Sequence, residues 1–282
     1  MSGRAVPTRY GGVSVSYTCD VDALSPALRH AYTPLDADAS TKAWIDDANE
    51  RPHGRAALAA LAIARSVMSD YDANGLVGAH DMRVVGTDQA RRLFRAVGLE
   101  EGGSLLDVGA GEGQVTDELA PLFGRVTTTE LSSGMARRLR KRGYPCHEID
   151  LATQTLPDAE ERFDAIALLN VIDRTSRPYT LVERLTKLLK PGGVLFCAVP
   201  LPLSPHVHVG PVTMDPEELL PVERGSFERG ASALAEMFFP ACGLSVEALS
   251  RVPYLCRGSR KTPVIVLDDP LFLCRRRSIR IA

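Results

Sequence analysis

The sequence passes from an apolar run into a glycine-rich turn at Leu105-Leu106-Asp107-Val108-Gly109-Ala110-Gly111-Glu112-Gly113. Residues 104–108 predict a short buried strand, and residues 114–123 predict a helix. Glycines between them let the backbone approach a ligand closely, because side chains there would fill the space that a nucleoside needs. Residues 125–129 predict the next strand, and Glu130 at its end can accept hydrogen bonds from both ribose hydroxyls. This order indicates a nucleoside-cofactor site.

The glycine spacing separates two kinds of cofactor. Dinucleotide folds use G-x-G-x-x-G, whereas this chain has G-x-G-x-G with Asp107 two residues before Gly109. A carboxylate at position 107 would repel a pyrophosphate, but it suits the sulfonium and ammonium groups of S-adenosylmethionine. The charge pattern therefore favours the methyl donor over NAD. Taken alone, the glycine motif also fits an ordinary tight turn from strand to helix.

The second half of the chain continues the alternation of strands and helices. Apolar runs predict strands over residues 163–170 and 194–199, with a helix over 178–189 between them. Lys190-Pro191-Gly192-Gly193 is a stop-and-turn signal before the fifth strand. Residues 244–251 and 264–267 then predict the last two strands. We therefore expect an α/β, Rossmann-like class I methyltransferase fold, a seven-stranded sheet with an antiparallel last strand.

The first hundred residues carry weaker patterns. Residues 1–50 show little apolar periodicity, and the composition of the first twenty is compatible with disorder. Residues 54–70 predict a helix, Asn74-Gly75 predicts a turn, and residues 88–97 predict a second helix. We therefore expect a poorly defined segment at 1–50, a helical extension at 51–100 and the methyltransferase domain at 101–282.

Composition limits the possible partners and compartments. The net charge of −2 gives no electrostatic case for nucleic acid or an anionic membrane. Six scattered cysteines without a C-x-x-C pair suit a reducing compartment and argue against a zinc ribbon or a disulfide framework. The N-terminus lacks an apolar signal core, and the longest apolar run is about half a membrane span. We therefore expect a soluble, cytoplasmic protein without a membrane span.

Three further groups of residues are candidates for the site. Asp150, at the end of a strand predicted over 146–150, can bond the adenine amino group, although a plain turn acid fits as well. Asn170 and Asp173 follow the fourth strand, where a bound donor would present its methyl group, although Asp173 also fits a helix-start acid. His206-Val207-His208 lacks a nearby third metal ligand, so surface or pocket-wall histidines are favoured and no metal site is predicted.

Several of these segments are similar to one family. The chain resembles the DREV methyltransferases, a family of protein-histidine methyltransferases, over roughly residues 66–274. The L-N-x-x-D-R and P-Y-L-C-x-G segments are far more specific than the glycine motif, which all class I methyltransferases share. The resemblance is carried by Asp72-Ala73-Asn74-Gly75-Leu76-Val77-Gly78, Leu105 to Gly113, Thr129-Glu130-Leu131-Ser132, Leu169-Asn170-Val171-Ile172-Asp173-Arg174, Val252-Pro253-Tyr254-Leu255-Cys256-Arg257-Gly258 and Val266-Leu267-Asp268-Asp269.

The resemblance implies an activity and a set of site residues. The activity is transfer of the methyl group of S-adenosylmethionine to the pros nitrogen, Nδ1, of histidines in H-x-H motifs of other proteins, which leaves S-adenosylhomocysteine. Asp173 would face the substrate imidazole. Matching the family motifs places the cofactor pocket at Asp107, Gly109, Glu130, Asn170 and Tyr254, to which the glycine turn adds Gly111 and the predicted third strand adds Asp150.

Two features depart from the family pattern. Val264-Ile265 stands where members often carry tyrosines before V-L-D-D, which affects the peptide pocket. Animal members also begin with a hydrophobic leader that is absent here, so their localisation does not carry over.

The expected catalytic residues are Asp173 and Asn170. A carboxylate at Asp173 that accepts from Nε2–H would leave Nδ1 bare and aimed at the methyl group. Two other functions compete with this one. The same fold can serve a small-molecule or lipid methyltransferase. A non-catalytic cofactor-binding scaffold is the other rival, although intact Asp107, Glu130, Asn170 and Asp173 weigh against it.

Overall fold

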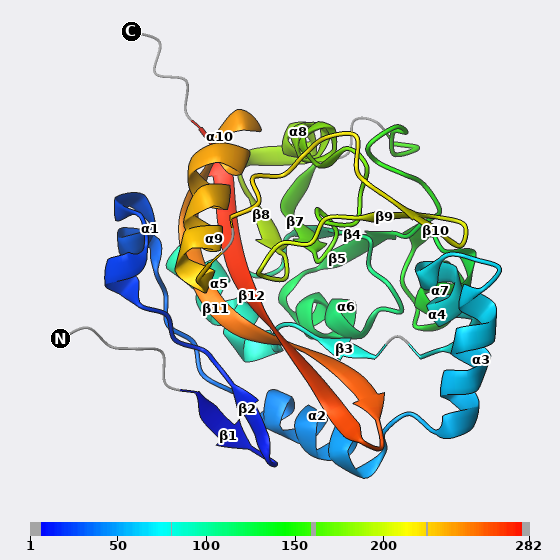
Figure 1. Cartoon of the computed structure of the whole chain (residues 1–282). Helices are drawn as coiled ribbons and strands as arrows, with labels where there is room; N and C mark the ends of the chain where they lie inside the picture. Colours follow the sequence, from blue (N-terminus) through cyan, green and yellow to red (C-terminus); the bar gives the residue numbers. More distant parts are fainter. Residues whose placement is uncertain (1–6, 80, 159–161, 224, 278–282) are drawn as a thin grey trace, which may run out of the picture.

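An eight-stranded sheet forms the centre of the molecule in the computed structural model, which describes residues 7–79, 81–158, 162–223 and 225–277 (Figure 1). The strand order is β3-β11-β12-β8-β7-β4-β5-β6. Residues 1–6 of the expected N-terminal segment and 278–282 of the expected methyltransferase domain lie outside these ranges. The strands are β3 (Met82–Arg83), β4 (Ser104–Val108), β5 (Arg125–Thr129), β6 (Cys146–His147), β7 (Phe163–Leu169), β8 (Leu189–Ala198), β11 (Leu244–Ser259) and β12 (Thr262–Arg276).

Strand directions confirm the expected class. Strand β4 is parallel to both β5 and β7, and β7 is parallel to β8. The last strand, β12, runs antiparallel to β8 and β11. The expected seven strands are therefore present with an antiparallel last strand. An eighth, β3, pairs its two residues with the outer edge of β11, and such a short strand has no readable pattern.

Two apolar layers cover the faces of this sheet because side chains alternate along each strand. Leu106 and Ile166 face one layer, which includes α8 (Pro178–Leu188) and α9 (Phe227–Ala233). Leu105 and Ala165 face the other layer, which includes α5 (Thr87–Ala96) and α6 (Gln114–Leu119). The parallel strands are thus buried on both faces, and their carboxyl ends open on one edge of the sheet.

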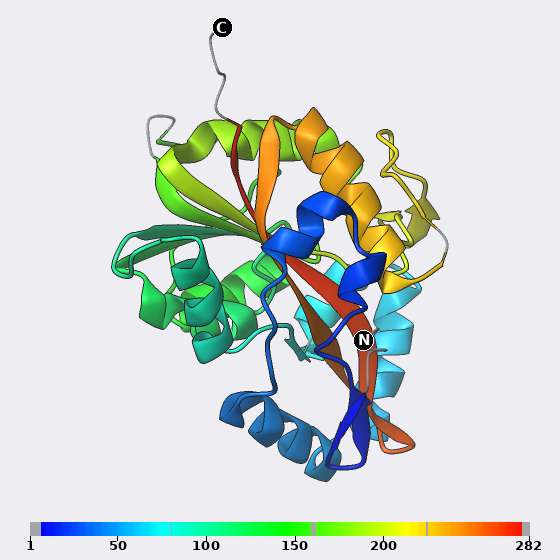
Figure 2. The same cartoon turned by 90° about the vertical axis from the view of Figure 1, so that its left-hand side faces the viewer.

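The N-terminal residues form structure that their weak pattern does not predict. Residues 7–50 form a hairpin of β1 (Thr8–Tyr10) and β2 (Val13–Val15), a 3₁₀ turn at Val21–Ala23, and the helices α1 (Pro26–Ala31) and α2 (Ala39–Glu50). Leu28, Leu35 and Ile45 are almost completely buried, so this part of the chain belongs to the core. Figure 2 shows α1 and the chain that leads to α2 lying across the β11–β12 pair.

Several predicted boundaries were wrong for local reasons. Strand β6 ends at His147 rather than at 150, because the Asp150 carboxylate accepts from the Ala152 N–H at 2.8 Å and starts a turn. Strands β11 and β12 are longer than predicted, since they continue past the sheet as a two-stranded ribbon (Figure 1). Before β11 the sequence carries a helical pattern over residues 218–239, but the helix begins only at Phe227, and it continues through a π turn over residues 234–238 into α10 (Phe239–Ala241).

The helix predicted over 54–70 is two helices, α3 (Arg55–Arg65) and α4 (Asp70–Val77). Ser69 breaks it, because its hydroxyl accepts from the Asp72 N–H and caps α4. The turn predicted at Asn74-Gly75 is also wrong, since both residues are buried inside α4. Gly75 lies against Gly134 of α7 (Ser133–Lys141), where a Cβ atom on Gly134 would lie 2.9 Å from the Gly75 carbonyl carbon.

Gly134→Val tests this helix contact. The added side chain has to push α4 away from α7, so we expect the free energy of unfolding to fall by about 1–3 kcal/mol in urea denaturation. Leu76→Ala is the control, because Leu76 lies on α4 with 64% of its surface exposed and should change stability by less than about 0.5 kcal/mol. Equal stability of the two variants would contradict the close contact.

Candidate functional site

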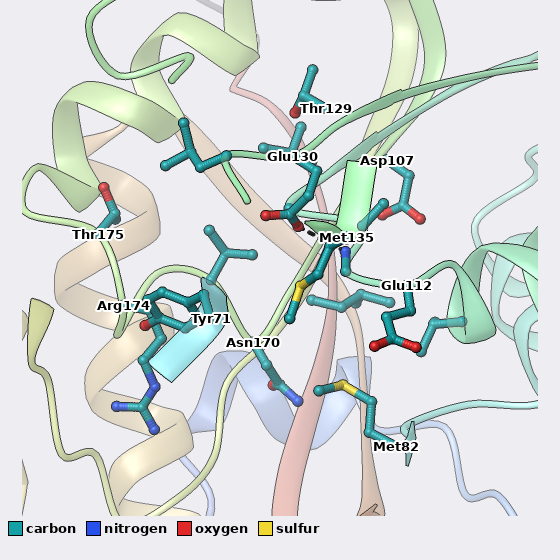
Figure 3. Close-up of a pocket in the computed structure, with 18 of the residues that line it drawn as sticks. Tyr71, Met82, Asp107, Glu112, Thr129, Glu130, Met135, Asn170, Arg174 and Thr175 are labelled. Carbon is teal, nitrogen blue, oxygen red and sulfur yellow. Dashed lines mark hydrogen bonds between the residues drawn. The ribbon is translucent and has the colours of Figure 1, made fainter. Parts of the chain in front are cut away.

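A cavity of about 490 Å³ opens at the carboxyl ends of β4, β5 and β7, which is where α/β sheets bind ligands. Helix α4 and the β11–β12 ribbon complete its walls. Arg174 and Tyr71 lie on one side of it, and Asp107 and Glu112 lie on the other, with Glu130 and Asn170 between them (Figure 3). Among the predicted site residues, those that line the cavity are Asp107, Gly109, Gly111, Glu130, Asp150, Asn170 and Tyr254.

The glycine turn follows β4 and forms the floor of the cavity. Gly109, Gly111 and Gly113 have φ angles of 67°, 59° and 90°, which other residues adopt only with strain. Position 109 needs glycine for a second reason, because a Cβ atom there would lie 2.7 Å from Cγ2 of Val171. The turn therefore needs glycine for its conformation and for the close approach of the loop after β7.

Glu130 is held by backbone groups from two elements. Its Oε2 accepts from the Gly111 N–H and its Oε1 accepts from the Ser132 N–H, both at 2.9 Å. Burial raises the pKa of Glu130, and the hydrogen bonds to backbone N–H groups oppose this rise. Each oxygen keeps a second lone pair, so the fixed carboxylate can still accept from two ligand hydroxyls.

Asp107 is a buried acid with one protein partner. Its Oδ2 accepts from the Thr116 hydroxyl at 2.7 Å. Burial raises its pKa to about 6, and the nearby charge of Glu130 adds to the rise. The two carboxyls give this side of the cavity a negative potential, which favours a cationic ligand and disfavours a pyrophosphate.

Asn170 and Asp173 follow β7 and contain unpaired polar atoms. Asn170 has a φ angle of 60°, and among the described residues neither its amide nitrogen nor its amide oxygen has a hydrogen-bond partner. Asp173 is 2% exposed and lies behind the wall rather than in it. One of its oxygens is 3.3 Å from Arg174 Nη2, and the other has no partner in the described part of the chain. Burial raises the pKa of Asp173.

The remaining predicted residues, Tyr254 and Asp150, also line the cavity. Tyr254, from β11, is 9% exposed, and its hydroxyl donates to the sulfur of Met82 at 3.5 Å. One oxygen of Asp150 accepts from the Ala152 N–H. This bond matches the role of a turn acid. The other carboxylate oxygen of Asp150 accepts from the Thr153 hydroxyl at 3.2 Å and keeps a lone pair for a further partner.

Distant segments supply wall residues that sequence analysis missed. Tyr71 comes from α4 and Met82 comes from β3, and neither belongs to a recognisable motif. Arg174 was quoted in the L-N-x-x-D-R segment without a role. His206 and His208 also line the cavity, which confirms them as pocket-wall residues. His208 belongs to a small hairpin of β9 (Val207–Val209) and β10 (Val212–Met214), and His206 directly precedes it.

Comparison with known proteins identifies the family. The model of the DREV methyltransferase family matches residues 16–276. The chain belongs to the DREV methyltransferase family. This is a family of S-adenosylmethionine-dependent methyltransferases with a class I fold, and the acidic cavity at the glycine turn has the charge that this cationic cofactor requires.

Curated relatives match a shorter part of the chain. The ubiquinone biosynthesis O-methyltransferase of Xanthomonas oryzae pv. oryzae (strain PXO99A) is 31% identical over 100 residues, 34% of this chain and 42% of the relative. The protein of the same description from Xylella fastidiosa (strain 9a5c) is 34% identical over 100 residues, 34% of this chain and 41% of the relative. The chain thus spans less than half the length of these relatives.

Solved structures resemble the chain more distantly. The N-methyltransferase NodS from Bradyrhizobium japonicum WM9, in complex with S-adenosyl-l-homocysteine, has a TM-score of 0.39 and 17% identity, covering 68% of this chain and 89% of NodS. A putative RNA methyltransferase from Pyrococcus horikoshii has a TM-score of 0.48 and 12% identity, covering 69% of this chain and 83% of that protein.

The described residues contain no helix with the length and apolar character of a membrane span. They also contain no group of three or more His, Cys, Asp or Glu side chains that could hold a metal ion.

Asp107→Asn tests the buried acid through its pH dependence. The pKa of Asp107 is about 6 in the folded protein and about 4 in the unfolded chain, so the folded state binds the proton more tightly. As the pH rises from about 4 to about 6, the carboxyl loses this proton at a growing cost, and the free energy of unfolding falls. We expect the variant to be more stable than wild type by about 3 kcal/mol at pH 7.5 in urea denaturation, with a smaller gain at pH 4.5. We also expect weaker binding of S-adenosylmethionine, measured by calorimetry.

Asp88→Asn is the control for this experiment, because the Asp88 side chain is 80% exposed on α5. It should leave cofactor affinity unchanged and stability within about 0.5 kcal/mol of wild type. A stability gain for Asp107→Asn that is equal at both pH values, together with unchanged cofactor affinity, would show that Asp107 is neither strained by burial nor part of the cofactor site.

Proposed function

We propose that this methyltransferase acts on Nδ1 of histidines in H-x-H motifs of other proteins. The observation that carries the proposal is a pair of polar side chains after β7, half-buried Asn170 at the cavity wall and buried Asp173 behind it. The Asn170 amide lies near the buried Asp269 carboxylate, and one oxygen of Asp173 has no partner among the described residues. An unsatisfied buried polar group costs about 1–3 kcal/mol. A ligand that supplies hydrogen-bond donors there would recover this cost, and an imidazole N–H is such a donor.

The proposed cofactor position follows from the fixed groups of the cavity. The ribose hydroxyls would bond to Glu130, since both carboxylate oxygens are already oriented by backbone N–H groups. The backbone at Gly109 and Gly111 would approach the methionine part, whose ammonium group is favoured by the Asp107 charge. Asp150, Asn170 and Tyr254 line the same cavity, so Asp150 would contact the adenine, and Asn170 and Tyr254 would lie near the methyl group.

Transfer from a sulfonium depends mainly on alignment of the nucleophile with the departing sulfur. The lone pair of Nδ1 forms the new bond to the methyl carbon, and the electron pair of the broken S–C bond returns to sulfur. A carboxylate that accepts from Nε2–H would select the tautomer with a bare Nδ1 and stabilise the imidazolium product.

Asp173 would fill this role once Arg174, which partly covers it, moves aside. The Arg174 side chain is 28% exposed, so it can move without opening the core. Burial gives Asp173 a raised pKa, which makes it a better proton acceptor than an ordinary carboxylate when the product loses its proton.

A methylation assay with a labelled donor tests the proposed substrate class. We expect purified protein to label a peptide that contains H-x-H, and to label the matched peptides A-x-H and H-x-A much less. Tandem mass spectrometry and comparison with methylhistidine standards should place the methyl group on Nδ1. Quinones, phenols and lipids form the competing panel, because the curated relatives are ubiquinone O-methyltransferases. Labelling of this panel without labelling of the peptide would contradict the proposal in favour of a small-molecule enzyme.

Asp173→Ala separates the chemistry from cofactor binding. Since Asp173 does not line the cavity, we expect the dissociation constant for S-adenosylmethionine to stay within about threefold of wild type. Turnover of the H-x-H peptide should fall by about 100-fold or more, as for the loss of a group that acts on a proton in transfer. Asp173→Asn is the matched variant, since it keeps the shape but removes the charge. Turnover near the wild-type rate in both variants would show that Asp173 has no catalytic role.

A further inference from the structure

The chain carries an H-x-H sequence of its own in the wall of this cavity. His206, Val207 and His208 all line it. His206 directly precedes the β9–β10 hairpin, and Val207 and His208 begin it. Within the described residues the two strands of this hairpin pair only with each other, and Figure 1 shows the hairpin extending from the end of β8 toward α4. Val209, Val212 and Met214 in the hairpin are each more than half exposed. The hairpin is therefore attached to the body mainly through its histidine end.

His206 anchors this segment to the loop that follows β7. Its backbone N–H donates to the Asp173 carbonyl oxygen at 2.9 Å. Its ring lies against the Arg174 guanidinium, with Nδ1 2.6 Å from Nη1. The first histidine of the motif thus sits beside the residues proposed for catalysis, and a neighbouring cation covers its ring nitrogens. Methylation would first make this ring cationic, and a positive charge so close to the Arg174 guanidinium is disfavoured.

His208 has a different environment. Its ring packs edge-on between Tyr71, at a centroid distance of 5.4 Å, and His206, at 5.1 Å. Its Nδ1 is 3.3 Å from the hydroxyl of Thr213, and within the described residues its Nε2 has no hydrogen-bond partner. Burial lowers the pKa of His208, so the ring is neutral near pH 7 and keeps a free lone pair on one nitrogen.

We infer that His208 is a substrate of the protein's own site and is methylated on a ring nitrogen within the same molecule. This inference rests on the proposed function, because it assigns to the H-x-H segment in the cavity the reaction proposed for H-x-H segments of other proteins. The ring nitrogen forms a bond to the methyl carbon, and the S–CH₃ bond breaks with its electron pair on sulfur. The ring proton then leaves to solvent, which yields neutral methylhistidine and S-adenosylhomocysteine.

The size of the cavity supports a reaction within one chain. Its volume of about 490 Å³ lies in the lower half of the range of about 300–1,000 Å³ that holds a drug-sized ligand. A bound nucleoside cofactor would occupy most of this space, which leaves the hairpin histidines as the imidazoles nearest to it. A substrate peptide from another protein would then compete with the hairpin, and methylation in the same molecule gains the advantage of proximity.

Intact-mass analysis of the purified full-length protein tests this inference. The protein is first treated to remove bound cofactor and is then incubated with S-adenosylmethionine. We expect a mass gain of one methyl group, which tandem mass spectrometry should place on His208. The fraction methylated per unit time should not change over a 100-fold dilution of protein, because the reaction is intramolecular. An added H-x-H peptide should slow the gain, whereas an A-x-A peptide should not.

Variants at three histidines complete the test. His208→Ala should abolish the mass gain, and His30→Ala should retain it, because His30 is an exposed histidine on α1. His206→Ala turns the segment into A-x-H, so the mass gain should be slower, and the label that remains should still be on His208. Protein that methylates the added peptide while its own mass stays unchanged would overturn the inference and leave the proposed function intact. Protein that binds the cofactor but methylates neither peptide nor itself would overturn both.

Discussion

The structure depends on the burial of a carboxylate, Glu130, between backbone groups of two neighbouring elements. A buried charge is costly unless hydrogen bonds replace the lost water, and the N–H groups of Gly111 and Ser132 supply them. These two bonds connect the glycine turn after β4 with the end of β5. The same contact therefore fixes the shape of the turn and presents the carboxylate to the cavity, so folding of this edge and formation of the cofactor site are one event.

Other polar groups around the cavity are satisfied less completely. Asp107 has a single hydroxyl partner, and the Asn170 amide and one oxygen of Asp173 have no partner in the described part of the chain. Asn170 also adopts a left-handed conformation that is uncommon outside glycine. Unpaired and strained groups of this kind persist where binding or catalysis requires them, and the surrounding core stabilises them. Several of these groups lie beside the cavity, at the ends of β4 and β7.

The sequence predicted the parts of the site that lie in local motifs. A glycine turn between an apolar strand and a helix has few structural alternatives, so Gly109 and Glu130 could be placed before the structure was known. Tyr71 could not, because it reaches the cavity through the contact between Gly75 and Gly134, which joins segments far apart in the chain. The N-terminal fifty residues were also underestimated, since their buried side chains are spread over short elements without a regular period.

The position of Asp173 shows a second limit of motif reasoning. The L-N-x-x-D-R segment fixes the order of residues after β7, but the direction of each side chain depends on Arg174 and on the hairpin that bonds to this loop. Asn170 consequently lines the cavity, whereas Asp173, three residues later, is covered. Membership of the DREV methyltransferase family accounts for the cofactor and the fold.

A crystal structure of the protein with S-adenosylhomocysteine and an H-x-H peptide tests the central claim most directly. The account predicts that both ribose hydroxyls bond to Glu130, that the amino acid part of the cofactor lies along the glycine turn, and that one peptide imidazole directs Nδ1 at the sulfur while its Nε2–H bonds to Asp173. A ribose bound away from Glu130, or a peptide bound far from the residues that follow β7, would contradict it.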